Sequence, residues 1–119
     1  MTIGVMIYHN PRCTKSRETL NLLKDKGVEP LSVVEYLNHT PGVFELKNIL
    51  KFMGNPPVRS IMRTNETVYK DLNLADESLS DMDLLKAIKA NPILLQRPIV
   101  VKGQKAAIGR PPEDVLSIL

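Results

Sequence analysis

A single cysteine, Cys13, in a chain of 119 residues limits what this chain can fold into more sharply than any other feature. It excludes an internal disulfide framework and a zinc site built on several thiolates. The two histidines, His9 and His39, lie far apart in the sequence, so we expect no metal site. A hydrophobic core must therefore stabilise the chain, and a chain of this size can bury about two-thirds of its surface on folding.

The composition is that of an ordinary globular protein, with 43% hydrophobic and 24% charged residues. We expect one domain over residues 1–119, because domains of this length are common. The net charge of +3 is scattered, and aromatic residues make up only 4% with no tryptophan, which argues against a nucleic-acid partner. No apolar run is long enough to span a membrane, so we expect a soluble cytoplasmic protein whose thiol stays reduced. Nothing in the sequence demands more than a monomer.

The first third of the chain has the pattern strand, helix, strand. Ile3–Tyr8 is a short apolar run rich in β-formers, as in a strand buried on both faces of a parallel sheet. A turn-rich break leads into Thr14–Lys26, which predicts a helix that Gly27 ends. Leu31–Tyr36 is expected to form the second strand, parallel to the first, because a helix connects the two.

The remainder predicts helices, then a hairpin, then a final helix. Helical segments are expected from Thr40-Pro41 to Gly54, over Val58–Arg63, over Glu66–Asn73 and from a Ser80 cap to Asn91-Pro92. Strands are expected at Ile99–Lys102 and Ala106–Ile108, and the last helix at Pro111-Pro112. The order predicts a thioredoxin-like α/β fold: a four-stranded mixed sheet, βαβ then ββα, with a helical insertion between the halves.

Cys13 is expected at the start of the first helix, where unpaired N–H groups and the helix dipole favour an anion. That position favours the thiolate, which is the nucleophilic form, and Lys15 and Arg17 would add to the effect if they face it. Ser16 completes a C-x-x-S pattern and could donate its hydroxyl to the sulfur. A buried structural cysteine is the alternative, but the polar setting HNPRCTKSR favours a reactive thiol.

Three arginines adjoin turns, namely Arg63, Arg97 and Arg110, and Arg59 is a fourth. A planar guanidinium binds tetrahedral oxyanions through paired hydrogen bonds, although any one arginine can be an ordinary surface charge. In a thioredoxin-like fold the loop before the third strand faces the start of the first helix. We therefore expect Arg97 near Cys13, and Arg97-Pro98 is a candidate cis peptide.

Four segments together resemble the glutaredoxin-linked arsenate reductase family. They are Tyr8–Arg17 (YHNPRCTKSR), Val58–Arg63 (VRSIMR), Asn91–Val101 (NPILLQRPIVV) and Ile108–Pro111 (IGRP), in the family's order along the whole chain. The resemblance implies that Cys13 is the nucleophile, assisted by His9 and Ser16. From the residues alone, His9 could equally help to bind an anion or cap a turn. Arg63, Arg97 and Arg110 are then the arginines that bind the oxyanion and the thiol.

The activity that this resemblance implies is the reduction of arsenate to arsenite for arsenic detoxification. Glutathione would be the co-substrate and glutaredoxin the partner, with no bound cofactor. Two alternatives stay open: a general glutathione-dependent thiol reductase, and a regulator of the same fold that binds RNA polymerase. Regulators of that kind often carry a C-x-x-C redox switch, and Ser16 in its second position disfavours this alternative.

Overall fold

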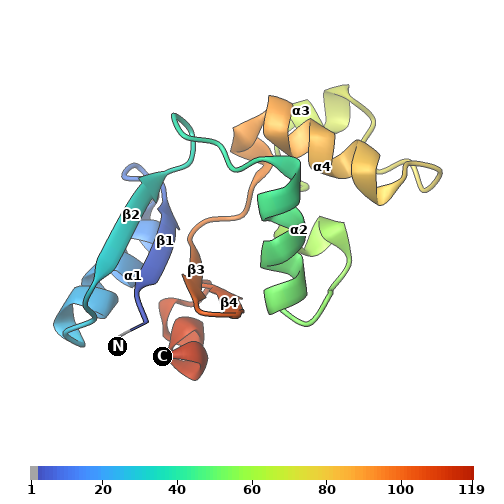
Figure 1. Ribbon diagram of the computed structural model, residues 1–119. Coiled ribbons are helices and arrows are strands. Elements are labelled where there is room, and N and C mark those ends of the chain that lie inside the picture. The colour runs from blue at the N-terminus through green and yellow to red at the C-terminus, as the bar shows by residue number, and fades with distance from the viewer. Residues whose placement is uncertain (1–2) are drawn as a thin grey trace. The chain divides into compact units, whose positions relative to one another are not determined.

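A computed structural model describes residues 3–119, and these residues form two compact units (Figure 1). The sheet unit comprises the chain up to His39 together with Arg97–Leu119, and the helical unit is Thr40–Gln96. The helical unit is thus inserted between the two halves of the sheet unit, as the sequence predicts. Whether residues 1–119 behave as one domain stays a prediction.

The sheet unit holds one four-stranded mixed sheet in the order β2-β1-β3-β4. β1 (Val5–His9) pairs in parallel with β2 (Leu31–Glu35) and antiparallel with β3 (Ile99–Lys102), which forms a hairpin with β4 (Lys105–Ile108). Between β1 and β2 runs helix α1 (Thr14–Asp25), and after β4 comes a 3₁₀ helix, η3 (Pro112–Ile118). This is the predicted βαβ plus ββα arrangement of a thioredoxin-like fold.

One face of the sheet is covered by α1 and η3. Val5 and Ile7 of β1 share that face with Val100 of β3, and Leu23 of α1 and Val115 of η3 pack against them. Alternate residues of a strand point to the same face, so β1 needs apolar residues at these two positions. The packing fixes α1 against the sheet and therefore fixes the turn that precedes it.

The helical unit contains three α-helices and two 3₁₀ helices within the described residues. They are α2 (Val43–Phe52), η1 (Val58–Ile61), α3 (Thr67–Asp71), α4 (Asp81–Ala90) and η2 (Pro92–Leu94). The predicted cap of α4 is confirmed, because Ser80 Oγ accepts the Asp83 N–H and the Asp83 carboxylate accepts the Ser80 N–H. Leu84, Leu85 and Ile88 form its buried stripe, as predicted.

Two helix predictions are wrong in detail. The helix expected to start at Thr40-Pro41 begins at Val43, because Gly42 is extended and its carbonyl accepts the first helical hydrogen bond, from Leu46 N. The last segment is a 3₁₀ helix, which places successive side chains on three sides. Only one of these sides is buried: Val115 is fully buried, whereas Leu116 and Leu119, expected to pack, are more than one-third exposed.

The peptide bond between Arg97 and Pro98 is cis, as the sequence suggests, and those at Glu29-Pro30 and Arg110-Pro111 are cis too. Arg97 is the first residue of the sheet unit after the helical insertion, and it leads into β3. Within residues 3–119, no helix combines the length and the apolar character that crossing a bilayer requires.

Candidate active site

Cys13 is the N-cap residue of α1 and lies in the turn that follows β1. Its backbone is extended (φ −96°, ψ 124°), its carbonyl accepts the Arg17 N–H at 3.0 Å, and its own N–H donates to the Asn10 carbonyl at 3.0 Å. The side chain is half-buried. The predicted position at the start of the helix is therefore confirmed, and the thiol is accessible to a small reactant.

The surroundings of Cys13 favour its thiolate. Burial alone raises the pKa of the thiol, but the backbone N–H of Ser16, the guanidinium of Arg97 and the backbone N–H of Lys15 lower it by more. The net effect places the pKa of Cys13 below its ordinary value. Hydrogen bonds to an anion and a nearby positive charge both stabilise the charged form, which is the nucleophile.

Arg97 lies beside the sulfur, as the fold predicts. It is half-buried, and both a hydrogen bond and its charge act on the pKa of Cys13. Its Nε and Nη1 atoms are buried and have no hydrogen-bond acceptor among the described residues. Arg97 therefore keeps donors available for an anion that binds next to Cys13.

Arg110 comes to the same place from the end of β4. Its Nη1 lies 3.9 Å from Cys13 Sγ and donates to the Arg97 carbonyl at 3.2 Å. Gly109, immediately before it, allows this approach, because a Cβ there would lie 2.5 Å from Thr19 Oγ1 and 2.9 Å from Pro98 Cγ. The fold thus brings together Cys13, Arg97 and Arg110, which are far apart in the sequence.

His9 and Ser16 form a buried pair behind the turn. His9 Nδ1 is 2.6 Å from Ser16 Oγ, which also accepts the Asn10 N–H at 2.9 Å. When the hydroxyl proton is shared with His9, none is left for the sulfur. When His9 Nδ1 carries the proton instead, the hydroxyl proton is free to point at the sulfur, so the hydroxyl's support of the thiolate stays a prediction, whereas the Ser16 backbone N–H acts on the thiol in the structure.

The basic side chains next to Cys13 point elsewhere. Lys15 pairs with Glu18 at 3.4 Å, and Arg17 donates to the Pro11 carbonyl at 2.8 Å. The condition for an effect on the thiol, that the two side chains face it, is not met, because each has a partner along its own turn or helix. Lys15 contributes through its backbone N–H instead.

Tyr36 is a residue of the site that sequence reasoning missed. Its side chain is fully buried at the end of β2. Burial raises the pKa of Tyr36, and the nearby Arg97 charge and Asn10 side chain oppose that rise. The phenol therefore lies close both to the turn before Cys13 and to the arginine that faces the sulfur. Its only sequence signal is its place directly after a strand parallel to β1.

The two arginines of the helical unit are held there by local partners. Arg63 Nε pairs with Glu66 Oε1 at 2.9 Å. Arg59 of η1 donates to the carbonyls of Leu74 and Asp76 at 2.8–3.2 Å, so it connects η1 to the residues that follow α3. Any role of Arg63 toward an oxyanion stays a prediction from the resemblance. No cluster of three or more metal-ligating side chains occurs in residues 3–119.

Comparison with known proteins places these features in one family. The ArsC family model matches residues 8–118. The Escherichia coli protein named "Uncharacterized protein YfgD" is 56% identical over 119 residues, which are 100% of this chain and 99% of the relative. A Haemophilus influenzae arsenate reductase is 51% identical over 117 residues, or 98% of this chain and 100% of that protein.

A solved structure agrees over the full length of the chain. The structure of "Arsenate reductase from Vibrio cholerae" has a TM-score of 0.95 and 49% identity, and the match covers 100% of both chains. The residues around Cys13, Arg97 and Arg110 all fall within the part matched by the family model. The chain belongs to the ArsC family.

Proposed function

We propose that this protein is an arsenate reductase in which Cys13 is the nucleophile. The observation that carries the proposal is a thiol with a lowered pKa at the N-cap of α1, with Arg97 beside it. The relatives from Haemophilus influenzae and Vibrio cholerae carry this activity in their names, and they match the chain over nearly its whole length.

In the first step of this proposal, the Cys13 thiolate attacks the arsenic of arsenate. A sulfur–arsenic bond forms, and one arsenate oxygen leaves as water after protonation. Thiolate and arsenate are both anions, so their approach is repulsive until positive charge lies between them. Arg97 and Arg110 supply this charge at the place where the anion binds, which is an electrostatic task.

Glutathione then supplies the electrons. Its thiol attacks Cys13 Sγ, the sulfur–arsenic bond breaks, and the bonding pair stays on arsenic, which leaves as arsenite. The two sulfurs are left as a mixed disulfide, so two electrons have passed from sulfur to arsenic. Glutaredoxin returns Cys13 to the thiol by disulfide exchange. His9 and Ser16 assist by holding the turn, and Arg63 binds the oxyanion if the family resemblance extends to it.

The direct test measures arsenite formed from arsenate with glutathione plus glutaredoxin, with glutathione alone, and with neither. We expect turnover that needs glutathione, rises with glutaredoxin and is abolished in Cys13→Ser. Reduction of small mixed disulfides without any arsenite would instead support the general thiol reductase. Capture of RNA polymerase by the protein, with no turnover of either kind, would support the regulator.

A further inference from the structure

A hollow of about 350 Å³ lies where β1 and β2 end, next to the turn that carries Cys13. His9 and Glu35, the last paired residues of the two strands, line it together with the turn 10–12 and with Leu37 and Asn38. Figure 1 shows these two parallel strands ending side by side. Open α/β sheets bind small ligands at the carboxyl ends of their strands, and the volume of the hollow suits a small molecule.

The charges of this hollow are one cation and one anion. The Arg12 guanidinium and the Glu35 carboxylate both line it, and neither takes part in any hydrogen bond or ion pair with the described residues. Burial lowers the pKa of His9 despite the nearby Glu35, which favours its neutral form. A multiply charged oxyanion would be repelled by Glu35, whereas a ligand with a carboxylate and an ammonium group matches both side chains.

The hollow lies next to the residues that lead directly into the nucleophile, Cys13. Arg12 directly precedes Cys13, so their Cα atoms are about 3.8 Å apart. Asn10, another lining residue, accepts the Cys13 N–H through its carbonyl. The hollow is therefore lined by residues of the same turn that carries Cys13, so a ligand held at Arg12 and Glu35 lies next to that turn.

We propose that this hollow binds the γ-glutamyl end of the thiol co-substrate. Its α-carboxylate pairs with Arg12, its α-ammonium pairs with Glu35, and the cysteinyl thiol extends toward Cys13. The identity of the co-substrate as glutathione rests on the proposed function. The oxyanion is held by Arg97 and Arg110, neither of which lines the hollow, so the two reactants do not compete for one cation.

The test uses disulfide exchange at Cys13, without arsenate. The protein is first converted to its mixed disulfide with thionitrobenzoate. An added thiol then attacks Cys13 Sγ, forms a new disulfide and releases thionitrobenzoate, whose absorbance gives the rate constant; no net oxidation occurs. The measured quantity is the rate constant for glutathione divided by that for 2-mercaptoethanol, an uncharged thiol.

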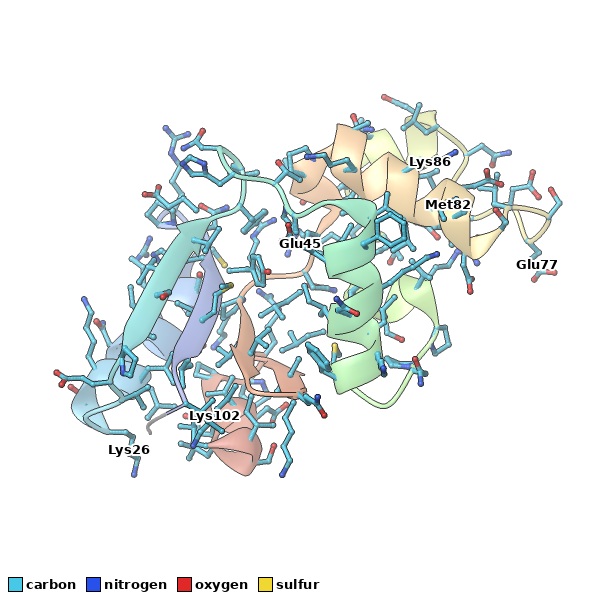
Figure 2. The ribbon with its side chains drawn as sticks, viewed as in Figure 1. Lys26, Glu45, Glu77, Met82, Lys86 and Lys102 are labelled. Atoms are coloured by element: carbon cyan, nitrogen blue, oxygen red, sulfur yellow. The ribbon has the colours of Figure 1, made fainter. Side chains whose placement is uncertain are left out.

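We expect Arg12→Gln and Glu35→Gln each to lower this ratio about fivefold, as for a partly exposed charge contact. Lys26→Gln and Asp25→Asn are matched controls from the far end of α1, where Figure 2 labels Lys26, and should leave it unchanged. Glutathione without its α-amino group should react as slowly with the wild type as intact glutathione does with Glu35→Gln. With Glu35→Gln, the rate constant for that analogue should fall no further than it does with the wild type.

An unchanged ratio in Arg12→Gln and Glu35→Gln would overturn the proposal. So would an equal fall in the rate for both thiols, because the substitutions would then act on Cys13 itself. The assay contains no arsenate, so it fails or succeeds independently of the proposed activity. A protein that reduces no arsenate but shows the charge-dependent ratio keeps the thiol site and loses only the proposed oxyanion substrate.

Discussion

At Cys13, burial and hydrogen bonding act on the thiol in opposite directions, and hydrogen bonding wins. We predict that the rate of alkylation by iodoacetamide rises with a midpoint pH below the ordinary thiol pKa of 9.0. Between the folded and unfolded pKa values the unfolded chain binds more protons, so stability rises with pH across that interval. This contribution is lost as the pH falls through the folded pKa. A midpoint at or above 9.0 would make Cys13 a structural cysteine.

The backbone N–H and the side-chain hydroxyl of Ser16 make different contacts, and one substitution removes only the hydroxyl. In Ser16→Ala the N–H that faces the sulfur remains, whereas Asn10 N–H and His9 Nδ1 lose their buried partner. We predict a loss of about 1–3 kcal/mol of unfolding free energy, measured in urea, with little change in the pKa of Cys13. A large rise in that pKa at unchanged stability would show that the hydroxyl acts on the thiolate.

The arginines are predicted to differ in what they bind. Protection of Cys13 from alkylation by sulfate or arsenate should weaken about tenfold or more in Arg97→Ala and in Arg63→Ala. Arg59→Ala should keep the protection, because its guanidinium already serves two carbonyls of its own segment. Arg97→Lys should restore it only in part, since an ammonium makes no forked contact. Equal protection in all variants would show that these arginines do not form the oxyanion site.

At the residue scale, the sequence predicts the positions of residues that are set by neighbouring parts of the chain, such as the turn before α1 and α1 itself. Cys13 at a helix start follows from the apolar strand before it and the helical pattern after it, and Arg97 follows from the fold. The place of Tyr36 and the contact of the Ser16 hydroxyl with His9 could not be predicted. Both depend on which side chain from another segment reaches the same buried point, and no local pattern encodes that contact.

Among the elements, the contact between α1 and the loop after β4 has no room for a Cβ at Gly109. A Cβ at Gly109 would meet Thr19 Oγ1 and Pro98 Cγ at distances that real atoms do not adopt. We predict that Gly109→Ala lowers the unfolding free energy by about 1–3 kcal/mol and also weakens oxyanion protection of Cys13, because Arg110 shifts. Thr19→Ala in the same chain should recover part of the stability, and no recovery would show that Pro98 dominates the clash.

The strands and the helices α1 and α4 are predicted within one or two residues, because the apolar runs, Gly27 and the Ser80 box are local signals. The start of α2 is not, since Pro41 at the first helical position and Gly42 at the N-cap are both good local solutions. Local sequence therefore does not decide between a start at Pro41 and a start after Gly42. The same holds for η3, where proline-led starts suit α and 3₁₀ helices alike.

For the whole molecule, one cysteine means that no internal disulfide can form, so any redox turnover passes through an intermolecular species. We predict that oxidation in the presence of glutathione adds one glutathione to Cys13, seen in the intact mass, and that glutaredoxin removes it. Turnover should stop without glutathione even when thioredoxin and its reductase are supplied. Full turnover under that condition would contradict the assignment and favour another thiol-exchange role.

The helical insertion also delays the synthesis of the arginines that surround the thiol. Cys13 leaves the ribosome early, whereas Arg110 follows 97 residues later and Arg97 begins only after the insertion is complete. At synthesis rates of about 5–20 residues per second, this delay is roughly 5–20 s. During it the cysteine lacks the guanidinium of Arg97, one of the groups that lower the pKa of its thiol in the folded protein. The full set of groups that favour the thiolate is therefore present only after β3 and β4 are made.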